Sequence, residues 1–424
     1  MYESKLFIAL IMLIMTSIFG SYFSRSKQLL SPGFVILVWW DFLIMFFLLF
    51  DDGETPYKGI IYTLGLIAIY EVGFWVGSIV EPSRMEFTHN VKFNYVYMKK
   101  WLVFTSLIII IPIIISFVRN GGLNRSLIST VSESAYQYYT TENSQSIIDK
   151  ITTQITSITI YGNAFLGGVY FLAVEKENKK FASIVFLPGI LQTVTTSGKL
   201  GFIITVFMFA IGMIAYRLKN PETVTLLSYW RIIRKYGIYG VGALFMLFMS
   251  LLFRFGQINS FYINETKRKF VNYAFGSVAA FNIWFNSREN ESLGYGSHTF
   301  TGILNTFGIV KRERGVYTEF ATSSFWNSNI YTAFRGIILD YGFWGSIIFM
   351  FIMGIIAGHS YNTFVEKKTY GTLTMLSFNY LFVLFSIFNF PFVYLNLTVF
   401  IPVILMIYCY FQNNYEANIS NDSI

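Results

Sequence analysis

The chain is dominated by continuous apolar blocks, most of them close to the length that an α-helix needs to cross a bilayer. Such a helix takes about 20 residues for about 30 Å of hydrocarbon. Hydrophobic residues make up 54% of the chain and charged residues only 13%, too few to cover a soluble domain of this size. The blocks do not alternate with polar residues as barrel strands do, so they favour helices. The sequence therefore predicts an all-α polytopic membrane protein.

Eleven membrane spans are predicted within a single transmembrane domain covering residues 1–424. The first block is expected to remain uncleaved, because no small-x-small cleavage site follows it. The segment 182–216 reads as two spans, or alternatively as a re-entrant or kinked unit. Cys409 is the single cysteine, which excludes a disulfide framework. The predicted spans are 6–23, 34–50, 59–80, 101–118, 151–174, 182–196, 200–216, 236–254, 336–357, 371–388 and 396–412.

The distribution of Lys and Arg predicts the orientation. One set of alternate loops carries 16 basic residues, and the other set carries 6 when the long loop 256–334 is left out. Short loops with more positive charge stay in the cytoplasm, so the C-terminus is expected inside. The N-terminus, the loop 119–150 and the long loop are then outside. A net charge of +8 could suggest nucleic acid, but the basic residues are scattered between spans, so topology and anionic ligands explain them better.

The long outer loop, 256–334, is the most informative region. It mixes basic, acidic, aromatic and glycine residues over almost 80 positions, and a stretch of this length without structure of its own is uncommon. We therefore expect helices and a folded lid, with an apolar, aromatic helix over 272–285 lying in the membrane interface. Charges in such a loop can also be simple solvation, which is the more ordinary interpretation of any single lysine in 267–269.

Four basic residues are expected at helix ends on the outer face. Each could extend to lipid headgroups, but four together would form a site for phosphate or pyrophosphate, especially where Arg can bind two oxygens at once. The sequence contains no P-loop, dinucleotide fingerprint, HExxH or GxSxG motif, and its three histidines fall in three different loops, so no metal site is predicted. The four residues are Arg119, Lys199, Arg254 and Arg335.

Two carboxylates, Asp41 and Glu71, lie inside predicted spans. Intramembrane acids can act as ion or proton relays, but these two are far from the outer face. The favoured interpretation is that they share a proton or bond Tyr and Trp neighbours to hold the second and third spans together. Asp340 is expected to orient Arg335 or to balance its charge. Two GxxxG motifs, at 73–77 and 354–358, would allow helices to approach closely.

The segment Asn329-Ile-Tyr-Thr-Ala-Phe-Arg335-Gly-Ile-Ile-Leu-Asp340-Tyr-Gly342-Phe-Trp-Gly345 resembles the block that closes the outer loop of bacterial O-antigen and capsule polysaccharide polymerases. These are the Wzy-type oligosaccharide repeat-unit polymerases. Similar pieces are Leu30-Ser-Pro-Gly33, Gly276-Ser277, Phe281-Asn282 and Gly296-Ser-His-Thr-Phe300, so the resemblance covers most of the chain. One departure is Lys199, which stands where many relatives have Arg.

This resemblance implies a GT-C-like membrane glycosyltransferase in the bacterial cytoplasmic (inner) membrane. Its substrates would be undecaprenyl-pyrophosphate-linked glycans, joined at the outer face into O-antigen (lipopolysaccharide) or capsule. Membrane lipids and a chain-length regulator would be its partners, with no nucleic acid, metal or cofactor. Basic residues would stabilise the leaving pyrophosphate, and a base would deprotonate the acceptor sugar.

The expected site residues follow from that chemistry. Arg335, Lys199, Arg254 and Arg119 would bind pyrophosphate, and Arg335 would also act in catalysis. His298 would be the base, with Glu319 as its rival. The sugar would be bound by Tyr295, Tyr317, Trp326, Asn329 and Tyr331.

Two other enzyme or transport functions stay open at this level. An O-antigen ligase-like enzyme would use the same donor and a different acceptor. A flippase or secondary transporter of lipid-linked oligosaccharides belongs to another class. Such a protein usually shows inverted repeats and interrupted helices that meet at mid-membrane. Here no repeat is evident and the charge is expected at one face, which disfavours transport. A non-catalytic scaffold would leave the clustered arginines without a task.

Overall fold

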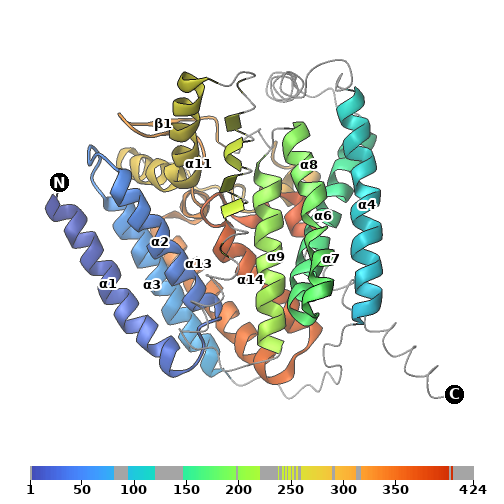
Figure 1. Cartoon of the computed structure of the whole chain (residues 1–424). Helices are drawn as coiled ribbons and strands as arrows, with labels where there is room; N and C mark the ends of the chain where they lie inside the picture. The colour runs from blue at the N-terminus through green and yellow to red at the C-terminus, as the bar shows by residue number, and fades with distance from the viewer. Residues whose placement is uncertain are drawn as a thin grey trace. The chain divides into compact units, whose positions relative to one another are not determined.

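The computed structural model confirms a helical membrane protein (Figure 1). It describes residues 2–80, 94–119, 147–196, 199–219, 259–288, 292–311 and 317–400, with single positions between 237 and 255 and at 403. Among them, seven helices are long and apolar enough to cross a membrane. The chain forms two compact units, Met1–Asn90 with Val271–Ile401, and Val91–Phe270 with Pro402–Ile424.

Among its described residues, the first unit has four long apolar helices and the shorter apolar helix α14, besides the helical segments of the long loop and a 3-10 helix. Ser31 caps the second of the long helices by accepting a hydrogen bond from the Phe34 amide (3.2 Å), and Pro32 occupies its first turn, where its missing N–H costs nothing. The shorter helix, α14, begins at a similar cap on Thr369. The helices are α1 (Tyr2–Arg25), α2 (Pro32–Phe50), α3 (Lys58–Ile79), α13 (Ala333–Lys367) and α14 (Tyr370–Phe385).

The closest helix pair of this unit is α3 with α13, and it is built on the two GxxxG motifs. A Cβ atom on Gly73 or Gly77 would collide with the carbonyl oxygen of a residue in α13. A Cβ atom on Gly354 or Gly358 would in turn collide with a carbonyl oxygen of α3. The two motifs therefore pack against each other, which confirms the expected close approach and fixes α13 on α3.

The long loop is folded, as expected. The first helix of the loop, α11 (Ser260–Ser287), covers the predicted helix 272–285. It packs on α2, where Phe275 stacks on Phe46 with ring centroids 5.3 Å apart. After it come α12 (Thr301–Thr306) and a two-stranded antiparallel hairpin, β1 (Ala321–Thr322) with β2 (Asn327–Ser328). The 3-10 helix η2 (Pro391–Val393) follows α14, and its Phe392 stacks on Phe300 with centroids 5.5 Å apart.

The second unit is also helical. Its main pair, α6 and α9, uses the same device, because a Cβ on Gly168 would strike the carbonyl of Phe209, and one on Gly212 that of Phe165. The unit contains α4 (Tyr95–Arg119), α6 (Ile147–Ala173), η1 (Lys176–Asn178), α7 (Lys179–Ser183), α8 (Phe186–Thr196) and α9 (Leu200–Lys219).

The predicted spans agree with the structure in most places. The seven apolar helices correspond to seven of them, and α14 is a shorter apolar helix over most of the predicted span 371–388. The predicted span 182–196 is not one helix but the end of α7 followed by α8, and Pro188 in the first turn of α8 suits a helix start. This agrees with the kinked alternative. The predicted span 236–254 is described only at scattered positions, and most of the predicted span 396–412 lies outside the described residues.

Candidate functional site

The site lies on a short helical segment at the start of α13. Gly342 has φ 72° and ψ −175°, so it breaks the helix and separates residues 333–341 from the long apolar part that follows. The amide of Ala333 donates to the carbonyl of Ser386 (2.7 Å), which ties the segment to the end of α14. The sequence predicts Arg335 at the end of a continuous span. In the structure it lies instead on a separate buried turn in front of the long apolar helix.

Arg335 is almost fully enclosed, with 4% of its surface exposed. Its guanidinium carbon lies 4.1 Å from the ring centroid of Tyr331, 4.2 Å from that of Tyr317 and 5.1 Å from that of Trp284. Aromatic faces attract a cation at these distances, and the attraction strengthens where water is excluded. We call Arg335 and these three rings the arginine cage.

One carboxylate reaches into the cage. Arg335 Nη2 donates to Glu319 Oε2 at 2.7 Å, a distance typical of a charge-assisted hydrogen bond. The Glu319 side chain is 70% exposed, whereas Arg335 is buried. Arg335 Nε and Nη1 are also buried, and neither has a hydrogen-bond partner among the residues that the structure describes. Within the part of the chain that the structure describes, two of the guanidinium nitrogens thus lack an acceptor.

The strand-like segment 317–320 carries Glu319 and is fastened by its backbone. The Tyr331 hydroxyl donates to the Glu319 carbonyl at 3.2 Å, and Asn329 Nδ2 donates to the Tyr317 carbonyl at 3.3 Å. Burial raises the pKa of Tyr331 above its usual 10.0, although the charge of Arg335 acts in the opposite direction, so the hydroxyl keeps its proton at neutral pH. Asn329 and Tyr331 thus position the cage.

Asp340 fixes a second segment beside the cage. Its carboxylate accepts hydrogen bonds from the amides of His298 (3.0 Å) and Thr299 (2.6 Å) and from the Thr299 hydroxyl (2.7 Å). The expectation that Asp340 orients Arg335 is wrong. Five residues of helix place the two side chains about 140° apart around the axis, so they face different neighbours.

The turn held by Asp340 presents His298 and Tyr295. The amide of Tyr295 donates to the Asp340 carbonyl at 3.2 Å, and Tyr295 has φ 47°, an uncommon conformation for a residue with a side chain. Its ring is 83% exposed. A Cβ on Gly336, next to Arg335, would lie 3.4 Å from the Tyr317 hydroxyl and 3.7 Å from His298 Cβ. The structure therefore brings His298 to the same short helix as the cage.

Trp326 has a different role from the expected one. It is 1% exposed, and its indole nitrogen donates to Asp51 at 3.0 Å. Ser324 donates to Asp52 through its hydroxyl and to Glu54 through its amide. This group of contacts, the hairpin clasp, fastens the β1–β2 hairpin to the turn between α2 and α3, and it leaves the buried Trp326 ring no open face for a sugar.

The other predicted basic residues belong to the second unit or lie outside the described residues. Lys199 precedes α9 in the second unit and is half-buried. Arg254 lies outside the described residues, and Arg119 ends α4 with a side chain that is not described. The structure therefore confirms no four-residue basic cluster.

The intramembrane acids differ from their expected roles. Asp41 accepts a hydrogen bond from Thr16 of α1 rather than from a Tyr or Trp. Glu71 is 1% exposed, and neither carboxyl oxygen has a partner among the described residues. The expected proton sharing between the two is not seen.

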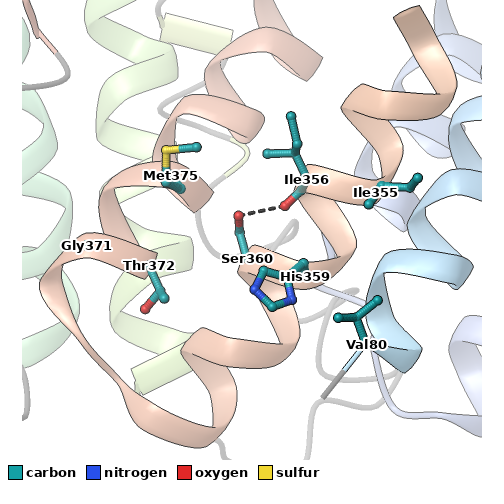
Figure 2. A pocket seen from close by; sticks show the side chains of 8 residues that line it. All are labelled: Val80, Ile355, Ile356, His359, Ser360, Gly371, Thr372 and Met375. Atoms are coloured by element: carbon teal, nitrogen blue, oxygen red, sulfur yellow. Dashed lines mark hydrogen bonds between the residues drawn. The ribbon is translucent and has the colours of Figure 1, made fainter. Parts of the chain in front are cut away.

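A cavity of about 400 Å³ lies toward the opposite end of α13 (Figure 2). It is lined mainly by apolar side chains of α13 and α14, with Val80 after α3 and with His359 and Ser360. His359 follows Arg335 by 24 positions. The unbroken part of α13 from Gly342 to His359 alone spans about 26 Å at 1.5 Å per residue, so this cavity and the cage are separate features.

Sequence reasoning missed two contributors to the site. Trp284 lies in the predicted apolar helix 272–285, and Thr299 lies in the motif 296–300, but neither pattern indicates a contact with Arg335 or Asp340. The sequence signal for the cage is that Tyr317 and Tyr331 precede Arg335 by fewer than 20 positions. This spacing does not show that the two rings converge on the guanidinium.

Comparison with known proteins adds no relative. No family model, curated protein or solved structure matches the chain.

Proposed function

We propose that this chain is a membrane glycosyltransferase that polymerises undecaprenyl-pyrophosphate-linked repeat units into O-antigen or capsular polysaccharide. The reaction would take place at the outer face of the cytoplasmic membrane. The observation that carries the proposal is Arg335, a buried cation on a helix that also contacts the His298 turn. Two of its nitrogens have no acceptor among the described residues. The resemblance of the segment 329–345 to repeat-unit polymerases agrees with it.

The chemistry assigned to this site is displacement at an anomeric carbon. The bond between that carbon and the pyrophosphate oxygen breaks, and a glycosidic bond forms with a hydroxyl of the acceptor sugar. Arg335 stabilises the negative charge that develops on the leaving lipid pyrophosphate. His298 takes the proton of the acceptor hydroxyl, a role that imidazole suits near neutral pH. Glu319 is the alternative base.

Sugar binding is assigned to Tyr295. Its ring is the exposed one of the predicted aromatic residues, whereas the rings of Tyr317 and Tyr331 surround Arg335. The unusual backbone of Tyr295 is held from Asp340, which agrees with a functional position. Lys199, Arg254 and Arg119 remain proposed contacts to pyrophosphate.

The test is reconstitution of the purified chain in vesicles with a lipid-pyrophosphate-linked repeat unit. We expect a ladder of longer lipid-linked products. Replacing Arg335 by Ala should abolish the ladder, and replacing it by Lys should lower the rate strongly because the two-oxygen geometry is lost. Lys311→Ala, an exposed cation in the same loop, is the matched control and should retain the ladder.

The same experiment distinguishes the alternatives. Transfer of a single glycan to a lipid A-core acceptor without a ladder would favour a ligase. Movement of the substrate across the vesicle without new products would favour a flippase. Either result would refute polymerisation.

A further inference from the structure

We infer that Glu319 occupies the anion position of Arg335 and has to leave when the anionic group of a substrate binds. This rests on the proposed function, because it assumes that Arg335 binds the lipid pyrophosphate. It goes further in assigning Glu319 as an internal competitor that sets how strongly the site holds that group.

The first support is the incomplete ion pair. A guanidinium offers five N–H donors in a planar fork that fits two oxygens at once. In the structure, Nη2 meets Glu319 Oε2 at 2.7 Å, while Nε and Nη1 are buried without a partner among the described residues. Buried donors without acceptors are unfavourable, so the site is better satisfied by a ligand with more oxygens than Glu319 supplies.

The two partners also differ in burial. Arg335 is enclosed between the rings of Tyr317 and Tyr331 and is 4% exposed. The Glu319 side chain is 70% exposed and can rotate into water. Its backbone is held separately by the Tyr331 hydroxyl, so the carboxylate can leave without unfolding the segment.

These features define the class of ligand. A group that displaces a carboxylate attached to the same chain has to bind more strongly than that carboxylate. A phosphate or pyrophosphate group has more charge and more oxygens than a carboxylate. It can therefore supply acceptors for the nitrogens that have none among the described residues. A simple carboxylate such as acetate has no such advantage. The geometry therefore points to a phosphoryl oxyanion as the group that replaces Glu319.

The test measures binding of inorganic pyrophosphate to the purified full chain by calorimetry, with no glycan present. Glu319→Gln should lower the Kd about 1.5- to fivefold, the range that corresponds to removing one competing ion pair with an exposed partner. Arg335→Gln should abolish binding, and Arg335→Lys should weaken it. Glu366→Gln removes the same charge from an exposed position at the far end of α13 and should leave the Kd unchanged.

Several outcomes would overturn the inference. They are an unchanged or weaker affinity in Glu319→Gln, an equal gain in Glu366→Gln, binding that persists in both Arg335 variants, or binding of acetate as strong as that of pyrophosphate. Melting curves of each variant show whether it is folded, and Arg335→Lys keeps the test valid if Arg335→Gln is not. The measurement needs no turnover. Its failure therefore leaves the ladder experiment to decide the polymerase proposal, and a missing ladder leaves this result standing.

Discussion

The contact between α3 and α13 gives the sharpest test of the fold, because the same helix supplies both the variant and its control. A Cβ on Gly73 would collide with the carbonyl oxygen of Phe351 and lie 3.2 Å from the Cα of Gly354. A Cβ on Gly65, also in α3, would meet nothing within 4 Å. Gly73→Ala should therefore push the helices apart, whereas Gly65→Ala should not.

The two substitutions should change the free energy of unfolding in different directions. Overpacking a tight contact destabilises by about 1–3 kcal/mol, partly offset in Gly73→Ala by up to about 1 kcal/mol from the better helix propensity of Ala. Gly73→Ala should thus lose about 1–2 kcal/mol, and Gly65→Ala should be neutral or gain up to about 1 kcal/mol. Gly354→Ala should behave like Gly73→Ala, because its Cβ would collide with the Tyr70 carbonyl oxygen.

The assay is unfolding in mixed micelles by a denaturing detergent, monitored by tryptophan fluorescence. The double variant Gly73→Ala with Gly354→Ala should cost less than the sum of the single variants, because helices already separated by one methyl group admit the second more easily. Equal stability of Gly73→Ala and Gly65→Ala would refute the close approach. Strict additivity in the double variant would refute the idea that both glycines serve one contact.

Two further predictions concern the segments around the cage. Asp340→Asn should destabilise the 294–299 turn by about 2–3 kcal/mol, because the carboxylate accepts bonds from buried amides, and hydrogen exchange at His298 and Thr299 should rise while that of α14 does not change. The second prediction is that the hairpin clasp loses stability at low pH. Burial alone would raise the pKa of Asp52, but hydrogen bonds from Ser324 and from backbone amides hold that pKa below its ordinary 3.8. A lowered pKa contributes stability that is complete above pH 3.8 and is lost as the pH falls below it. Proteolysis of the hairpin should therefore speed up near pH 3 but not at pH 5, and Ser324→Ala should reduce the difference between those two values.

The sequence by itself determined the membrane class and most of the helices. Blocks of about 20 apolar residues can satisfy their backbone in lipid only as helices, so composition and length suffice for this step. Some helix ends are set by local chemistry, because capping acts over three or four residues, as Ser31 and Pro32 show. The predicted span 34–50 nevertheless began two residues after this helix start. The two GxxxG motifs could be recognised in the same way. That they face each other could not, since nothing local selects the partner of a helix.

The long loop shows more clearly which features could not be predicted from the sequence. Its folded character and the helix over 272–285 followed from length and composition, and Arg335 was identified from its place at the edge of a span. Its surroundings were not foreseen. Trp284, Tyr317 and Tyr331 come from three separate segments, and Asp340 turned out to hold the His298 turn instead of Arg335.

Only the tertiary structure decided those relations, for two physical reasons. The break at Gly342, where φ is 72°, separates the turn of Arg335 from the long helix. Glycine adopts positive and negative φ about equally readily, so the sequence does not predict this break. A buried ion pair and its aromatic neighbours depend on which segments the fold brings within a few ångströms of each other. Residue types along a chain can propose such partners, but contacts across 16 or 50 positions are chosen by the packing of the whole unit.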